Sequence, residues 1–233
     1  MPLGICFLTN LEYLNLNHNN ISGTIPIEIS SLISLNLLDL SSNALTGVVP
    51  ASIGNLIELT VLSFSNNQLF GFIPSSIGNL IKLKLFYLYH NQINGSIPQS
   101  ISRLISLVDL ELSTNKLSGP IPSSIENLLS SSIPDIIGTL KSPVNLWLSE
   151  NKLRGFIPSS IGSLLSNNSL SGSLPDNICL GGQLQNFTAA QNEFTGRLPK
   201  SLKNSCSLHK VRLEMNQLTG YLSVDLGIYP HLD

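Results

Sequence analysis

The stretch ISLNLLDLSSNALTGVVPASIGNL, residues 33–56, contains in 24 residues every feature that sets the architecture of this chain. Residues 9–32, TNLEYLNLNHNNISGTIPIEISSL, and residues 57–80, IELTVLSFSNNQLFGFIPSSIGNL, match it position by position. The prolines keep the same period of 24 residues: Pro26, Pro50, Pro74, Pro98 and Pro122. A fixed period of this length predicts stacked repeats and not an ordinary globular domain.

Each constant position of the unit has a mechanical role. The alternation of apolar and polar residues at 38–40 predicts a short strand with its leucines inward. Asn43 stands where the strand becomes a turn, and stacked copies of this amide are expected to form a ladder of hydrogen bonds. Gly47 permits a backbone conformation that a side chain would obstruct. The Ile-Pro pair then fixes an extended return stroke.

The pattern LxxLxxLxLxxNxLxGxIPxxIGxL of these units resembles the plant-specific leucine-rich repeat of receptor-like kinase ectodomains, over essentially the whole chain. Residues 169–218 resemble the later repeats of such receptors. Period and resemblance together predict an α/β-type repeat solenoid. Its expected form is a curved superhelix with a parallel β-sheet on the concave face and short turns or 3-10 segments on the convex face. No unit buries its apolar face alone, so stability should come from stacking between neighbours.

The repeat pattern is interrupted twice within one expected solenoid at 1–233. Full units are expected over about 9–128, a half unit at 129–140, and further units over 141–229 with a shortened one at 165–181. Both losses remove the half that carries the strand, so stacking is expected to be disturbed near 128–145 and 162–170. Neither of the Cys-pair caps typical of the family is visible, which favours a fragment of a larger ectodomain.

Composition excludes several classes of protein. Charged residues make up 11% of the chain, against about 25% in an average domain, and the net charge is −2. The chain therefore lacks the basic surface that grips nucleic acid. No run approaches the roughly 18 apolar residues of a membrane span, and the start, MPLGICFL, is not a convincing signal peptide. Three cysteines, Cys6, Cys179 and Cys206, cannot all pair within one chain.

Motifs for enzyme chemistry are missing from the sequence. There is no G-x-x-x-x-G-K-[ST], H-E-x-x-H or G-x-S-x-G, and none of the kinase motifs. His18 and His90 share a register but lie three units apart, roughly 14 Å at strand spacing, too far to share a metal or a proton. The sequence predicts a non-enzyme without cofactor or metal, although full-length members of the family resemble transmembrane serine/threonine kinases.

The phase of the repeat assigns outward-facing side chains on the concave sheet. Aromatic side chains on a rigid exposed sheet are typical binding anchors, and Tyr87, Tyr89 and His90 beside Asp109 and Glu111 form the predicted centre, whose acidic rim favours a basic ligand segment. The alternative role of Trp147 is to fill the gap left by the half unit. The candidate ligand-binding residues are Tyr13, His18, Asp39, Tyr87, Tyr89, His90, Asp109, Glu111, Trp147, Glu150, Lys210 and Arg212.

Two further features concern charge and modification. Some peptide-binding members of the family clamp a ligand carboxylate with Arg-x-Arg, which Lys210 and Arg212 resemble; here the first residue is a lysine, a point charge without the planar fork, and the alternative is a solvated charge pair. The N-x-[ST] sequons predict glycosylation in a secretory compartment at Asn20, Asn94, Asn167 and Asn186. A glycan on Asn186 would project over the concave face.

These features predict an extracellular segment of a plant leucine-rich-repeat receptor, on the apoplastic face of the plasma membrane. Its partners would be a peptide or protein ligand and a co-receptor ectodomain, with no catalysis in this chain. A secreted inhibitor resembling polygalacturonase-inhibiting proteins and a non-functional receptor fragment stay open as alternatives. An ice-binding solenoid would need a flat, regular array of Thr or Ser, and the concave residues are too irregular for that.

Overall fold

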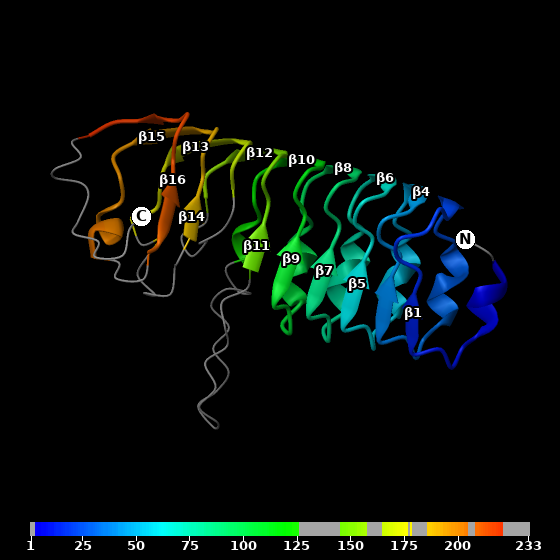
Figure 1. Cartoon of the computed structure of the whole chain (residues 1–233). Helices are drawn as coiled ribbons and strands as arrows, with labels where there is room; N and C mark the ends of the chain where they lie inside the picture. Colours follow the sequence, from blue (N-terminus) through cyan, green and yellow to red (C-terminus); the bar gives the residue numbers. More distant parts are fainter. Residues whose placement is uncertain are drawn as a thin grey trace, which may run out of the picture.

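The computed structural model describes residues 3–125, 145–157, 165–176, 178, 186–204 and 208–220. Figure 1 shows the repeating units side by side in chain order, from β1 near the N-terminus to β16 at the other end. Each complete unit contributes a strand to an inner sheet, a strand to an outer sheet and a short 3-10 helix. All strand pairs are parallel. The predicted solenoid with a parallel sheet and 3-10 segments is confirmed.

The inner sheet is built from strands of three residues each, one per unit. The side chain at the middle of the strand points into the core, as the alternation in the sequence predicts. Its strands are β1 (Tyr13–Asn15), β3 (Leu37–Asp39), β5 (Val61–Ser63), β7 (Leu85–Tyr87), β9 (Asp109–Glu111), β11 (Asn145–Trp147), β14 (Asn186–Thr188) and β16 (Lys210–Arg212).

The outer sheet follows the asparagine turn in each unit and was not predicted as a sheet. Its residues are mostly small and polar, without an alternating apolar pattern, so this pairing comes from the stacking of the units and not from local propensity. Its strands are β2 (Ser22–Thr24), β4 (Ala44–Val48), β6 (Gln68–Gly71), β8 (Gln92–Gly95), β10 (Lys116–Gly119), β12 (Lys152–Gly155), β13 (Ser169–Ser173), β15 (Glu193–Gly196) and β17 (Gln217–Leu218).

The 3-10 helices cover the side of the core opposite the inner sheet, and several begin directly after the constant proline. Serine side chains connect successive turns: Ser52 Oγ donates to the Ile27 carbonyl at 2.8 Å, and Ser76 Oγ to the Ala51 carbonyl at 2.6 Å. The helices are η1 (Leu3–Phe7), η2 (Ile27–Ser31), η3 (Ala51–Asn55), η4 (Ser75–Asn79), η5 (Gln99–Arg103), η6 (Ser123–Ile125) and η7 (Lys200–Asn204).

The asparagine ladder forms as the sequence predicts. Asn91 accepts the Leu69 N–H on Oδ1 at 3.0 Å, and its Nδ2 donates to carbonyls of both its own and the preceding unit. The ladder passes both interruptions, since Asn151 Oδ1 accepts the Leu117 N–H and Asn168 Oδ1 accepts the Leu153 N–H, each at 3.0 Å. Each of these three amides therefore ties its unit to the previous one.

The two interruptions have different consequences. At the first, β9 pairs directly with β11 and β10 with β12, so both ladders continue across the interruption. Residues 126–144, which include the predicted half unit, lie outside the described residues. At the second, β12 still pairs with β13, but the inner sheet that starts at β1 ends at β11, and β14–β16 form a separate pair. Among the described residues, only the inner sheet is divided.

Candidate ligand-binding face

Strand register arranges the exposed side of the inner sheet, here called the concave face, into rows that run along the solenoid. Because side chains alternate along a strand, the first and third residues of each strand face outward. The first row contains Tyr13, Leu37, Val61, Leu85, Asp109 and Asn145, and the second contains Asn15, Asp39, Ser63, Tyr87, Glu111 and Trp147.

The first row begins as an apolar track. Tyr13 is 65% exposed, and Leu37, Val61 and Leu85 are half-buried. The phase of the repeat places these three aliphatic residues on the outward side, although they are not among the candidate ligand-binding residues predicted from the sequence. The sequence contains a signal for this track, because three successive units carry an apolar residue at an outward position, whereas most other outward positions are polar. The track leads along the sheet to Asp109.

Side chains from three neighbouring strands come together at Asp109. The Tyr87 hydroxyl donates to Asp109 Oδ2 at 3.3 Å, and the Trp147 side chain also donates a hydrogen bond to this carboxylate. Asp109 Oδ1 is buried and has no hydrogen-bond partner among the described residues. Together with Glu111, these residues on β7, β9 and β11 form the aromatic–acid patch. Trp147 thus joins the predicted centre, because strand pairing brings β11 directly against β9.

The carboxylates of the patch have no lysine or arginine partner among the described residues. Burial raises the pKa of both Asp109 and Glu111, opposed at Asp109 by the two aromatic donors and at Glu111 by the Ser113 hydroxyl, which donates at 3.2 Å. Burial and the neighbouring Asp109 raise the pKa of Tyr87 to about 12. Among the described residues, no lysine or arginine forms a salt bridge with either carboxylate. A cationic ligand group would supply the missing charge.

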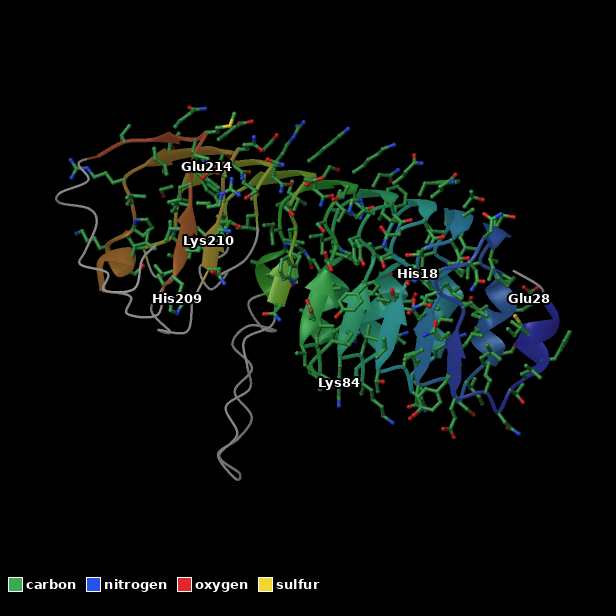
Figure 2. All side chains as sticks on the ribbon, viewed as in Figure 1. His18, Glu28, Lys84, His209, Lys210 and Glu214 are labelled. Atoms are coloured by element: carbon green, nitrogen blue, oxygen red, sulfur yellow. The ribbon has the colours of Figure 1, made fainter. Side chains whose placement is uncertain are left out.

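Three predicted residues occupy the turns after the inner strands. His18, His90 and Glu150 all have left-handed backbones, with φ of 52°, 51° and 55°. The His90 ring contacts Tyr89 edge-on at 5.7 Å between centroids, beside the patch, and Glu150 Oε2 accepts from the Thr114 hydroxyl at 3.1 Å. His18 lies in the first unit, away from the patch (Figure 2).

Asp39 differs from Asp109 because its hydrogen bonds are satisfied within the chain. It accepts from Asn17 Nδ2 at 3.0 Å on one oxygen, and from the Ser41 hydroxyl at 2.6 Å and the Ser41 N–H on the other. The next serines, Ser63 and Ser65, are buried, with hydroxyls 3.3 Å apart. Both oxygens of Asp39 are therefore used to hold Asn17 and Ser41 in place, and Asp39 is less suited than Asp109 to bind a ligand.

The basic pair Lys210 and Arg212 lies on β16, exposed and apart from the patch; Figure 2 shows Lys210 and Glu214 together in the C-terminal units. Arg212 donates to Glu214 Oε1 through both Nε and Nη2. This pairing was not predicted from the sequence, although Arg212 and Glu214 lie two residues apart and therefore face the same side of the sheet. The arginine fork is thus engaged by a neighbour, which weakens the case for a carboxylate clamp.

The predicted glycosylation residues occupy three kinds of position. Asn20 and Asn167 are exposed next to turns, Asn94 is half-buried on β8, and Asn186 is exposed on β14 of the concave face. Cys6 is buried with a free thiol, while Cys179 and Cys206 lie outside the described residues.

Across the described ranges, no three His, Cys, Asp or Glu residues cluster closely enough to hold a metal ion. Within the same part of the chain, no helix combines the length and apolar character needed to cross a bilayer.

Comparisons with known proteins agree with this architecture. The Leucine Rich Repeat family pattern matches residues 10–32, 34–56, 58–80, 82–104, 106–128 and 143–164. No curated protein sequence matches the chain. Among solved structures, the plant peptide hormone receptor RGFR1 in complex with RGF2 is similar with a TM-score of 0.85 and 32% identity, over 94% of this chain and 34% of that one.

Two further structures extend the comparison. The Arabidopsis receptor kinase HAESA, in complex with the peptide hormone IDA and the co-receptor SERK1, matches with a TM-score of 0.68 and 34% identity over 94% of this chain and 40% of that one. A plant ice-binding protein matches with a TM-score of 0.75 and 28% identity over 94% of this chain and 69% of that one. The present chain thus spans between a third and two fifths of the two receptor chains. The predicted resemblance to plant receptor ectodomains is confirmed, and the chain belongs to the leucine-rich-repeat family.

Proposed function

We propose that this chain is an extracellular ligand-binding segment of a plant receptor, and that a peptide or protein ligand binds along its concave face. The observation that carries the proposal is the aromatic–acid patch, where the carboxylates of Asp109 and Glu111 are partly desolvated and flanked by Tyr87 and Trp147. In the described part of the chain, neither carboxylate forms a salt bridge. Unpaired, partly buried charge is unfavourable, so a basic group of a ligand would be stabilised there.

The rows suggest the chemistry of the ligand. An extended segment running along the first row would place apolar side chains over Leu37, Val61 and Leu85, then reach Asp109 with a lysine or arginine. Aromatic faces also attract cations, by about 0.5–2 kcal/mol depending on desolvation. An arginine guanidinium fits the aromatic–acid patch better than a lysine ammonium does. A guanidinium both stacks on aromatic rings and donates bidentate hydrogen bonds to a carboxylate.

Several expectations from the sequence belong to the same proposal. The receptor to which the segment belongs would be located at the plasma membrane with this face in the apoplast, and a co-receptor ectodomain would be a second partner. The chain itself would bind without catalysing a reaction. The structural likeness to receptor ectodomains supports this assignment.

Ice binding is less well supported by the exposed rows. In the second row the residue type changes at almost every step, through Asn15, Asp39, Ser63, Tyr87 and Glu111, and the serine is buried. A surface that matches an ice lattice would need the same small group repeated at each step. The likeness to the plant ice-binding protein therefore indicates shared architecture.

A selection from a random peptide library on the immobilised full chain tests the proposal. We expect recovered peptides to combine apolar residues with arginine or lysine, and to bind Tyr87→Ala and Glu111→Gln more weakly than the parent. Glu193→Gln is the matched control, because Glu193 is exposed on β15 of the outer sheet and loses the same charge. Recovery of no peptides, or of peptides that bind Glu111→Gln as well as the parent, would refute the proposal.

A further inference from the structure

An exposed apolar cluster lies on the outer sheet, on the side of the molecule that the proposed ligand does not use. Val48, Phe70 and Phe72 are 50%, 50% and 68% exposed and come from adjacent units. Large exposed aromatic rings on a sheet are unfavourable in water unless something covers them. The sequence next to this cluster contains the sequon Asn94-Gly95-Ser96.

The register of β6 and β8 brings the ring and the sequon together. Phe70 pairs with Gln92 and Gly71 with Ile93, and Phe72 and Asn94 are the residues that follow this last pair. The Phe72 ring lies over Gly95, where a Cβ atom would overlap ring carbons Cδ1 and Cε1. Gly95 also has a φ of +71°, a conformation that favours glycine. A group attached to the Asn94 amide would therefore start beside the exposed ring.

We propose that Asn94 is N-glycosylated and that the first sugar packs its C–H face on Phe72. The sugar would then cover this exposed ring. In the transfer, the Asn94 amide nitrogen bonds to C1 of an N-acetylglucosamine. The bond from C1 to the pyrophosphate of a lipid-linked donor breaks, the lipid pyrophosphate leaves and the amide gives up one proton. The inference rests on the proposed extracellular location, since such transfer occurs in the secretory compartment, but it needs no ligand on the concave face.

The chain contains an internal control for this arrangement. Phe156 is 72% exposed and its ring lies over Gly172 in the same manner, with a φ of +81° at the glycine. The residue before that glycine is Ser171, so there is no sequon. The substitution Ser171→Asn would create one, because Ser173 already occupies the third position.

The test compares unfolding midpoints of the full chain secreted from a glycosylating eukaryotic host, with the modification read by intact mass. Ser96→Ala removes the sequon and leaves Asn94 in place. We expect it to lower the midpoint by about 2–4 °C in the parent, and to have no effect in a Phe72→Ser background. Ser171→Asn should raise the midpoint through Phe156 by a similar amount.

Expression in a bacterial host without glycosylation supplies the remaining comparison, where Ser96→Ala should leave the midpoint unchanged. An unmodified Asn94 in the eukaryotic product would overturn the inference. So would an equal loss from Ser96→Ala with and without Phe72, or the same loss in the bacterial protein. None of these results depends on peptide binding, so failure here and failure of the proposed function are distinguishable.

Discussion

The carboxylate of Glu111 is half-buried and accepts one hydrogen bond, from Ser113, with no salt bridge among the described residues. Burial raises its pKa above the usual 4.5. A raised pKa means that the folded chain holds the proton more tightly than the unfolded chain does. The protonated Glu111 side chain therefore contributes to the free energy of unfolding at pH below 4.5, and this contribution is lost as the pH rises through the folded pKa.

Replacing this charge should therefore stabilise the protein at neutral pH. We expect Glu111→Gln to unfold at higher denaturant concentration than the parent at pH 7, because glutamine keeps the acceptor for Ser113 and carries no charge. The difference should shrink as the pH falls through the raised pKa of Glu111 and should be smallest below 4.5. Denaturant titrations at several pH values measure this. Glu193→Gln on the outer sheet should show no such gain; an equal gain there would attribute the effect to net charge.

Thr114 is the one β-branched residue among the described non-glycine residues with positive φ, at 53°. Such a side chain is strained in the left-handed region, whereas asparagine tolerates it, and Asn66 occupies the equivalent position with the same φ. We expect Thr114→Asn to stabilise the chain by about 0.5–1 kcal/mol in equilibrium unfolding. Asn66→Thr should cost a similar amount, and the account is wrong at this position if neither change alters stability.

At the scale of the element, the asparagine ladder is a repeated side-chain tie between units, added to the backbone hydrogen bonds of the two sheets. Asn91 makes one hydrogen bond as acceptor and three as donor, reaching two neighbouring stretches of backbone. Removing it leaves several backbone groups without partners, so Asn91→Ala should destabilise by about 2–4 kcal/mol. Asn19 begins the ladder and donates only within its own turn.

Asn19→Ala is therefore the matched control in the same denaturant titration and should cost less than about 1 kcal/mol. Equal losses from the two substitutions would show that the amide acts within its own turn, and that the ties between units come from elsewhere.

The elements differ in how far the sequence predicted them. The inner strands and the asparagine ladder follow from local signals, the alternation at 38–40 and an amide at constant phase. The outer strands carry no such signal: Ser22–Thr24 becomes a strand only because β4 lies beside it. The contact of Trp147 with Asp109 was also beyond sequence reasoning, since it depends on β11 pairing with β9 across 33 intervening residues (112–144).

At the scale of the whole molecule, the ladders predict that the units on either side of the first interruption unfold together. Trp147 is the single tryptophan of the chain and lies just beyond that interruption. Stacked repeats are coupled through their nearest neighbours, so the fluorescence transition of Trp147 should coincide with the loss of far-UV circular dichroism. A fluorescence transition at clearly lower denaturant would contradict the observed strand pairing.

A substitution at the joint sharpens this test. Asn151 Oδ1 accepts the Leu117 N–H, and Asn151 Nδ2 donates to the Leu112 carbonyl, so this amide spans the interruption. We expect Asn151→Ala to move the Trp147 transition to lower denaturant than the circular dichroism transition, because coupling to the preceding units is weakened.

The claim on which the functional proposal depends is that a basic ligand binds at the aromatic–acid patch, and Trp147 reports on it directly. A fluorescence titration of the full chain with a basic peptide from the selection should give a saturable change in tryptophan emission. Glu111→Gln should weaken the binding by about tenfold. Binding that leaves the emission of Trp147 unchanged, or that is equally tight in Glu111→Gln, would place the ligand elsewhere and contradict the account.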